Sequence, residues 1–335
     1  MLKVFKPKRS VNLVIDDYAI RMVLYPRGGG LSKIKSLKEK QIPPGLIEHG
    51  RLMNEEKFGK FFRDTVQEWG LKRERVYFYV PDPLVIMKKE TYPARLKDDE
   101  IKGHFYMELG QTFYLPFENP VFDIYPIPAD DENADEREAL IFAAPEEELN
   151  KYTEIFTDAG LRPAVADIRH IGVYRYYSAI VQTGDEKDSI LFFEMNLPSI
   201  MISIFSNHIP EFFRFIELDL NMEENWQCEN DEEGFLQWKF TGNEEEFQGL
   251  IDDQMIELGR ILEFYQYSLH KGEKKVSKIV LCGDFPHLEK IRESIEKHTS
   301  LRVKILDGFL TSLKDERVPR SFIPALGLAL KGEVH

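Results

Sequence analysis

Cysteine and long apolar segments are both scarce in this chain. Cys228 and Cys282 are the only two thiols among 335 residues, so the sequence lacks the disulfide framework that stabilises small secreted domains. Every apolar run is interrupted by a charged residue, a proline or an asparagine well before the ~20 residues that a membrane-spanning helix needs. These absences predict a soluble, cytoplasmic protein whose thiols are structural or incidental.

A surplus of basic residues is absent as well. The chain has 44 Lys and Arg against 58 Asp and Glu, a net charge of -14, and no long basic stripe. Nucleic-acid binding generally needs such a stripe to neutralise phosphates, so the sequence predicts no nucleic-acid partner. The basic cluster at Lys3, Lys6, Lys8 and Arg9 is either a solvated chain end or a contact with an anionic membrane surface.

Several motifs that carry chemistry are missing. The sequence contains no Gly-x-x-x-x-Gly-Lys-Ser/Thr, no Gly-x-Gly-x-x-Gly and no Gly-x-Ser-x-Gly, and none of its 8 histidines is spaced as a metal-binding pair. P-loop, dinucleotide-binding and hydrolase chemistry are therefore not expected, and no metal site is predicted. Adjacent carboxylates such as Asp252 and Asp253 mean little among 58 acidic residues.

The chain does have enough apolar residues for two cores, and one pattern of expected secondary structure occurs in it twice. With 335 residues and 43% hydrophobic composition, two domains are expected. Residues 11–24 read as an apolar strand, an acidic turn and a second strand, and residues 189–204 repeat that order. Two such hairpins, each opening half of the chain, predict a duplicated RNase H-like α/β fold.

The first half continues in a way that fits this fold. Residues 31–41 read as a third strand, and Asn54 is a good N-cap for a helix. The apolar side chains of that helix form one stripe, and residues 75–81 are a further strand. The stripe consists of Phe58, Phe61, Phe62, Val66 and Trp69.

A different pattern occupies residues 92–166. It reads as a helix over 98–110, strands over 121–127 and 138–144, and a helix over 145–160. We interpret it as an inserted α+β subdomain. The resulting division is a first domain over 1–180 and a second over 181–335.

The second half begins with three strands that end near residue 218. We expect the acidic segment 223–246, with Trp226 and Trp238, to be a solvated loop. A long helix follows, with one apolar face running from Phe247 to Leu269. A parallel α/β unit comes next, and ligands bind at the carboxyl ends of strands in such units, so the turn after Cys282 is the best candidate pocket. The unit comprises a strand over 278–283, a turn, a helix over 286–298 and a strand over 301–306.

Four phrases in this order resemble a known family. The chain is similar to PilM, the actin-like type IV pilus assembly protein, which is close in fold to the cell-division protein FtsA. The similarity spans essentially the whole chain and rests on Pro44-Gly-Leu-Ile-Glu-His-Gly50, Ala159-Gly-Leu-Arg-Pro163-Ala-Val-Ala-Asp167, Glu257-Leu-Gly-Arg260-Ile-Leu-Glu-Phe-Tyr265 and Phe322-Ile-Pro-Ala-Leu-Gly-Leu-Ala-Leu-Lys331.

The resemblance implies an actin-like fold that holds ATP and Mg between its halves. It also implies a partner, the N-terminal cytoplasmic tail of a PilN-like inner-membrane protein, bound as an extended segment in a groove formed with the inserted region. The protein would then lie at the inner face of the cytoplasmic membrane and touch the membrane only through this partner. A pilus motor ATPase is a further possible partner.

The expected nucleotide site departs from the family pattern in both hairpins. Actin-like phosphate loops use Asp-x-Gly, in which the carboxylate holds the metal ion through water and the glycine lets main-chain N–H groups approach the phosphates. With Arg21 as the basic residue of the usual apolar-basic pair, Val14 stands at the Asp position and Asp16 at the Gly position. A shift of two residues restores an aspartate but places Tyr18 at the glycine position. Asp17 lies in the same turn.

The second hairpin and the adenosine turn depart too. Glu194-Met-Asn196 replaces Asp-x-Gly, and Gly283-Asp284-Phe285 keeps one glycine of the usual run. Phe285 is either an adenine-stacking ring or a core residue. Arg21 is either a phosphate contact or an ion-pair partner, and Arg260 is either a ribose contact or a surface ion-pair partner. No hydrolysis is expected from such loops, and binding of ATP and Mg is left open.

The sequence therefore favours an interaction scaffold of PilM type with a degenerate nucleotide cleft. The alternative is an active actin-like or sugar-kinase-like ATPase, which needs a metal-anchoring aspartate and an ordered phosphate loop. A third reading is a filament-forming protein, which sedimentation with and without nucleotide would reveal.

Overall fold

The computed structural model of the chain describes residues 9–26, 28, 30–128, 134–181, 188–309 and 317–332. Of the basic cluster at the start of the chain, only Arg9 falls within these ranges. No helix in this described part is both long and apolar enough to cross a membrane.

The first half of the chain forms a five-stranded sheet with the order β10-β6-β1-β2-β3. Strands β1, β2 and β3 are antiparallel neighbours, and β6 and β10 join them in parallel. The predicted third strand begins later than expected, because residues 31–33 form a turn of 3-10 helix. The strands are β1 (Arg9–Ile15), β2 (Ala19–Pro26), β3 (Ser36–Gln41), β6 (Arg75–Tyr79) and β10 (Arg162–Asp167).

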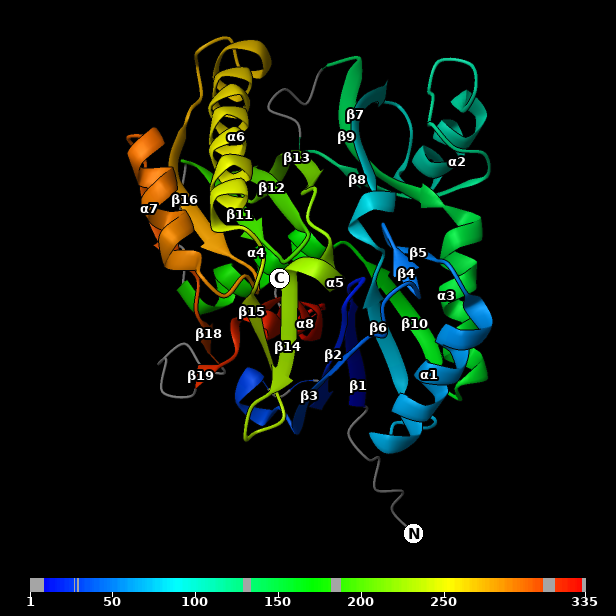
Figure 1. The fold of residues 1–335 in the computed structure, drawn as a ribbon. Helices are drawn as coiled ribbons and strands as arrows, with labels where there is room; N and C mark the ends of the chain where they lie inside the picture. The colour runs from blue at the N-terminus through cyan, green and yellow to red at the C-terminus, as the bar shows by residue number, and fades with distance from the viewer. Residues whose placement is uncertain are drawn as a thin grey trace.

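Two helices cover one face of this sheet (Figure 1). Helix α1 (Glu55–Glu68) begins where the side chain of Asn54 accepts a hydrogen bond from the main-chain N–H of Lys57 at 2.9 Å. Its apolar stripe packs against α3 (Glu146–Asp158). A small hairpin of β4 (Ile47–Glu48) and β5 (Arg51–Leu52) precedes α1.

A separate three-stranded sheet, ordered β7-β9-β8, projects from this domain. It consists of β7 (Ile86–Pro93), β9 (Glu136–Pro145) and β8 (Pro120–Pro126), and α2 (Asp98–Glu108) packs against it. This sheet starts before residue 92, and α3 packs into the first domain's core. The division into domains 1–180 and 181–335, with an insertion over 92–166, remains our proposal.

The second half repeats the topology of the first. Its sheet has the order β13-β12-β11-β16-β17, again three antiparallel strands joined by two parallel ones. Helices α6 (Glu244–Glu263) and α7 (Leu288–His298) contribute to its core. The strands are β11 (Ser189–Met195), β12 (Ser199–Ser206), β13 (Ile209–Glu217), β16 (Val276–Cys282) and β17 (Arg302–Ile305).

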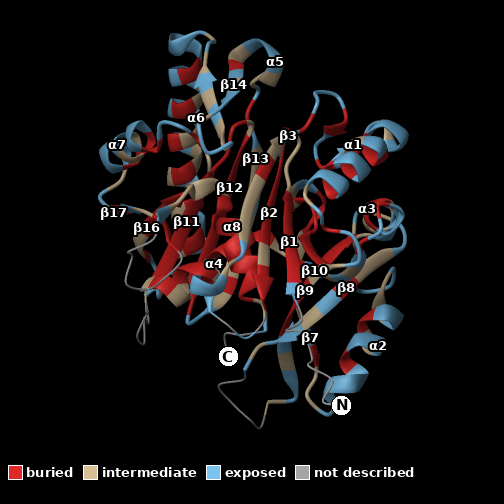
Figure 2. Ribbon diagram, turned by 90° about the horizontal axis from the view of Figure 1, so that it is seen from below, coloured by how far each residue is buried: buried red, intermediate tan, exposed pale blue. Residues whose placement is uncertain are grey.

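Two helices join the domains through a shared core. Helix α4 (Arg169–Val181) crosses α8 (Ile323–Ala329) so closely that a Cβ on Gly327 would lie 1.9 Å from the carbonyl oxygen of Gly172. The pair lies between the two sheets, and Figure 2 shows both sheets buried along this central layer. A short hairpin of β18 (Gly308–Phe309) and β19 (Arg317–Val318) lies beside it.

Two expectations about the second domain were wrong. The acidic segment 223–246 is not simply solvated: it contains α5 (Met222–Asn225) and a hairpin of β14 (Trp226–Asn230) and β15 (Leu236–Phe240), because its aromatic side chains pack on the core. Leu269 does not share the apolar face of α6. The chain changes to π-helix at Phe264–Leu269, which shifts the helical phase and leaves Leu269 41% exposed.

Candidate functional site

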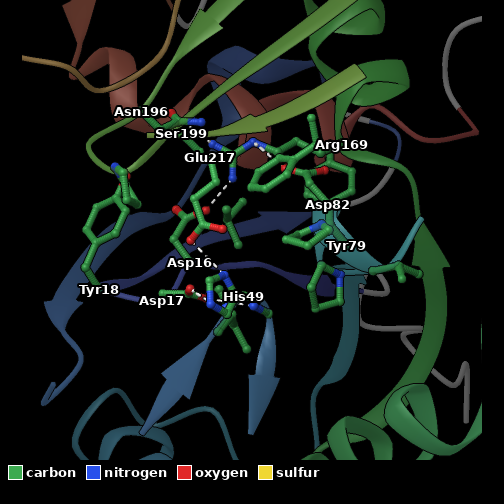
Figure 3. Close-up of a pocket in the computed structure, with 18 residues that line it drawn as sticks. Asp16, Asp17, Tyr18, His49, Tyr79, Asp82, Arg169, Asn196, Ser199 and Glu217 are labelled. Atoms are coloured by element: carbon green, nitrogen blue, oxygen red, sulfur yellow. Dashed lines mark hydrogen bonds and ion pairs between the residues drawn. The ribbon is translucent and has the colours of Figure 1, made fainter. Parts of the chain in front are cut away.

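Three turns meet where the two domains face each other. The β1–β2 turn carries Asp16, Asp17 and Tyr18, the β11–β12 turn begins with Asn196, and the turn after β16 carries Asp284. Figure 3 shows the side chains of Asp16 and Arg169 meeting inside the pocket at this junction. Its position matches the nucleotide cleft that the sequence predicts, so its chemistry decides what the cleft can hold.

Arg21 occupies the centre of this junction and is saturated by carboxylates. Its Nη1 donates to Asp16 at 2.7 Å, its Nε to Glu39 at 2.9 Å and its Nη2 to Asp284 at 2.5 Å. The side chain is only 1% exposed. Because each of its three nitrogens already donates to a carboxylate inside the protein, a phosphate would have to compete with these partners for the guanidinium.

Arg169, the first residue of α4, is a second buried cation in the junction. Its Nη1 donates to Asp16 at 2.5 Å and its Nε to Glu194 at 2.6 Å, while Nη2 lies 3.4 Å from the Asn196 side-chain oxygen. Asp16 belongs to the first hairpin, and Glu194 and Asn196 belong to the second. Arg169 therefore ties the two hairpins together.

Tyr18 fills the space beside the arginines. The side chain of this first-domain residue packs in the second domain's core, where its ring meets Trp238 edge-on at 5.4 Å. Its hydroxyl donates to Asp284 at 2.6 Å. Burial, and then the charge of Asp284, raises the pKa of Tyr18 well above its usual value, so the phenol stays neutral.

Two further aspartates have different environments. Asp17 accepts hydrogen bonds from the main-chain N–H groups of His49 and Gly50, at 2.7 and 3.0 Å, and so anchors the β4–β5 hairpin. Asp82, in a 3-10 turn (Asp82–Leu84) after β6, has one buried oxygen without a hydrogen-bond partner. Burial raises the pKa of Asp82 to about 8, although Arg169 opposes the rise.

The charge and the volume of the junction both limit its ligands. Four carboxylates are hydrogen-bonded to two guanidinium groups, which leaves an excess of negative charge, and a fifth, Asp82, lies 3.7 Å from Arg169 Nε. The remaining cavity measures about 50 Å³. Sites for drug-sized ligands typically enclose roughly 300–1,000 Å³, whereas a water molecule takes up about 30 Å³. Among the described residues no cluster of His, Cys, Asp or Glu is arranged to hold a metal ion.

The structure brings most of the predicted site residues together. One network joins Arg169 with Asp16, Arg21, Glu194, Asn196 and Asp284. Gly283 lies close beside it, since a Cβ at position 283 would be only 2.0 Å from the carbonyl oxygen of Met195, between Glu194 and Asn196.

Two predicted site residues lie outside this network, and each takes one of the two roles that the sequence analysis left open. Phe285 is a core residue, stacked on Phe247 at 5.4 Å and 3% exposed. Arg260 is 72% exposed on α6, 3.3 Å from Glu257.

Sequence reasoning missed Arg169, Glu39 and Asp82. One available signal was the place of Arg169, just beyond a parallel strand whose carboxyl end points at the cleft. Glu39 and Asp82 carried no such signal, because their partners come from distant segments.

A second, larger cavity lies beside the inserted sheet. It measures about 490 Å³, and apolar side chains from β8, β9 and α4 predominate in its lining. These include Val121, Phe142, Ala144, Ile171 and Tyr174, and Ile168 joins them from just before α4. We call this cavity the β8 groove.

The β8 groove follows a free strand edge. Strand β8 pairs with β9 alone in the described sheet, so its other edge is open. The bonds from Ile127 N–H to Glu138 and from Glu146 N–H to Asn119 fix which main-chain groups face β9. By the alternation of an antiparallel ladder, Phe122 and Ile124 direct their N–H and C=O groups away from β9. The edge therefore has two outward N–H groups between Pro120 and Pro126, of which that of Ile124 donates to the Asp123 side chain at 3.1 Å.

Ion pairs border the β8 groove. Asp167 accepts from Lys331 at 2.7 Å and lies 3.1 Å from Arg175, and all three residues line the cavity. Lys102 and Asp123 also line it. The polar margin and apolar floor resemble the general build of a peptide-binding groove.

Comparison with known proteins places the chain in a family. A sequence model of the family described as Type IV pilus assembly protein PilM matches residues 13–218. A search of curated proteins finds no match.

Solved structures support the fold. A structure described as the PilM-PilN type IV pilus biogenesis complex is similar, with a TM-score of 0.74, 18% identity and coverage of 96% of this chain and 98% of that chain. MreB5 of Spiroplasma citri bound to ADP is similar in fold, with a TM-score of 0.51, 8% identity and coverage of 98% and 97%. The actin-like fold predicted from the sequence is thus confirmed. Because the family model spans more than half of the chain, this protein belongs to the type IV pilus assembly protein PilM family.

Proposed function

We propose that this protein is an assembly scaffold that binds the N-terminal cytoplasmic tail of a PilN-like inner-membrane protein. The observation that carries the proposal is the β8 groove, an apolar cavity of about 490 Å³ along an open strand edge. The solved complex of a similar protein is described as containing PilN, which makes a PilN-like tail the first candidate. The protein would reach the inner face of the membrane through this partner.

The open edge of β8 determines how we propose that the tail binds. An extended tail would pair with the outward main-chain groups of Phe122 and Ile124, replacing the Asp123 side chain as the acceptor for Ile124 N–H, and extend the sheet by one strand. The side chains of Phe122 and Ile124 belong to the inserted core, so Val121, Asp123 and Tyr125 lie on the opposite face of β8. A tail with alternating apolar side chains would direct these toward Phe142 and Ile171, and the prolines at both ends would limit pairing to a short segment.

We also propose that the cleft between the hairpins does not take up ATP and Mg. Its cavity of about 50 Å³, its self-paired arginines and its excess of carboxylates all oppose a triphosphate. Any relay to a pilus motor ATPase would then depend on tail binding rather than on hydrolysis. The alternative, an active ATPase, requires the Arg169 and Arg21 ion pairs to open before nucleotide enters.

A blocking substitution tests the tail site. Val121→Arg places a long cation in the β8 groove and is expected to weaken a synthetic PilN-like tail at least about tenfold, measured by fluorescence anisotropy. Thr91→Arg is the matched control, because Thr91 is exposed on β7, the opposite edge of the same sheet. Equal affinity for both variants, with both folded by circular dichroism, would exclude the β8 groove as the tail site.

A further inference from the structure

The β14–β15 hairpin crosses from the second domain to the first. It leaves the second domain between β13 and α6, and Figure 1 shows β14 running across the front of the molecule toward β3. The main-chain N–H of Leu236 donates to a Glu39 side-chain oxygen at 2.6 Å. A strand inserted in one domain is thus bonded to the outer strand of the other domain's sheet.

Aromatic contacts fix this hairpin at three points. Trp226 meets Phe285 edge-on at 5.6 Å, near its own root in the second domain. Trp238 meets Tyr18, which comes from the first domain's hairpin turn. Phe235, at the tip, meets Phe322 at 5.4 Å. Phe322 belongs to the core that the two domains share.

The tip of the hairpin is organised before it reaches its partners. The side chain of Asp231 accepts hydrogen bonds from the main-chain N–H groups of Glu233 and Phe235, at 3.0 and 2.8 Å. These bonds close the turn and hold Phe235 in place. A preformed tip loses little conformational entropy when it docks, so the contact is stronger than that of a loose loop.

The hairpin is also coupled to the buried ion pairs. One oxygen of Glu39 accepts from Leu236 and the other accepts from Arg21 Nε. Arg21 in turn pairs with Asp16 and with Asp284, which holds the Tyr18 hydroxyl. Hairpin, arginine and tyrosine form one continuous set of contacts across the domain boundary.

We propose that the β14–β15 hairpin is an internal clasp that holds the two domains closed without a nucleotide. Its contacts within the protein bridge the two halves and take the place of contacts with a bound ligand. Opening the cleft requires the hairpin to leave Glu39, Tyr18 and Phe322 together. This proposal does not depend on where, or whether, a tail binds.

Hydrogen–deuterium exchange of the full chain, without tail or nucleotide, tests the clasp. Trp238→Ala removes the contact with Tyr18 and should speed exchange in residues 16–18 and in β3 about threefold to tenfold. Lys239→Ala is the matched control, because Lys239 is exposed on the same strand. Strand β17, the edge strand of the second domain's sheet, should exchange at the wild-type rate in both variants.

A second variant removes the clasp completely. The hairpin's base is narrow, since Thr241 N–H donates to the Asn225 carbonyl at 2.8 Å, so two glycines can replace residues 226–240. Small-angle X-ray scattering should then show a larger radius of gyration than for Lys239→Ala. Unchanged scattering, or faster exchange spread evenly over the second domain, would overturn the proposal and leave the hairpin as a core cover only.

Discussion

The cleft between the hairpins and the β8 groove are lined from the same short segment but are built in opposite ways. Arg169 lines the cleft, and its neighbours Asp167 and Ile168 line the groove. The cleft has about a tenth of the groove's volume, at about 50 against 490 Å³. In the cleft the polar side chains pair with one another, whereas along the groove main-chain groups face an open edge.

This difference is the basis of our proposal that the protein binds a peptide and not a nucleotide. Nucleotide binding needs cationic and main-chain donors that are free until the ligand arrives. The cleft has its donors already paired, so a phosphate would compete with carboxylates at 2.5–2.9 Å. Peptide binding by strand addition needs only an unpaired edge and an apolar floor, and β8 retains both.

The largest expected effect concerns the buried charges of the cleft. Arg169→Met leaves Asp16 and Glu194 without their shared guanidinium and should lower the free energy of unfolding by about 3–5 kcal/mol. Urea denaturation measures this loss. Arg260→Met, at a side chain that is 72% exposed, should change stability by less than about 0.5 kcal/mol. A loss below about 1 kcal/mol in Arg169→Met would mean that the network does not hold the domains together.

The next effect is a pH dependence that arises in the cleft. The pKa of Asp82 is raised to about 8 in the folded protein from an ordinary value of 3.8. Between these values the folded state binds a proton that the unfolded chain has released, so this contribution to stability decreases as pH rises toward 8.

Asp82→Asn mimics the protonated form and removes this dependence. From pH 6 to pH 8, the free energy of unfolding of the wild type should fall by about 2 kcal/mol relative to that of Asp82→Asn. Urea denaturation at several pH values measures the gap between the two proteins. A gap that stays constant over this range would show that Asp82 is ionised in the folded protein.

An effect of similar size is expected at the ring that fills the cleft. Tyr18→Phe removes the hydrogen bond to Asp284 but keeps the packing against Trp238, and should lower stability by about 1.5–3 kcal/mol. Tyr267→Phe is the control, because Tyr267 is 63% exposed. Thermal unfolding compares the two. Equal melting temperatures would show that the hydroxyl contributes nothing to closure.

Much of the fold could be predicted because it rests on local patterns. The stripe from Phe58 to Trp69 and the cap at Asn54 specify α1, and the two apolar hairpins specify the duplicated sheets. The segment 223–246 was misjudged, since its acidic composition hides an alternation in which Trp226 and Trp238 face the core. Leu269 was misplaced because a π-helical turn has no clear signature in a periodic pattern.

The candidate site was predictable only in part. Asp16, Glu194 and Asp284 were found because they stand where the family has its phosphate loops and adenosine turn, at or next to strand ends that meet at one junction. Arg169, the partner of Asp16 and Glu194, was missed, since its pairing with Asp16 across 153 residues of chain depends on how α4 enters between the sheets. The edge of β8 was also invisible in the sequence, because a strand's neighbours are set by the whole sheet.

The most direct test of the central claim is a calorimetric titration of the full chain with ATP and magnesium, followed by a synthetic PilN-like tail in the same cell. A scaffold with a self-paired cleft predicts no saturable heat from the nucleotide and clear binding of the tail. Micromolar binding of ATP would contradict this account, because it would mean that the Arg21 and Arg169 ion pairs yield to a triphosphate.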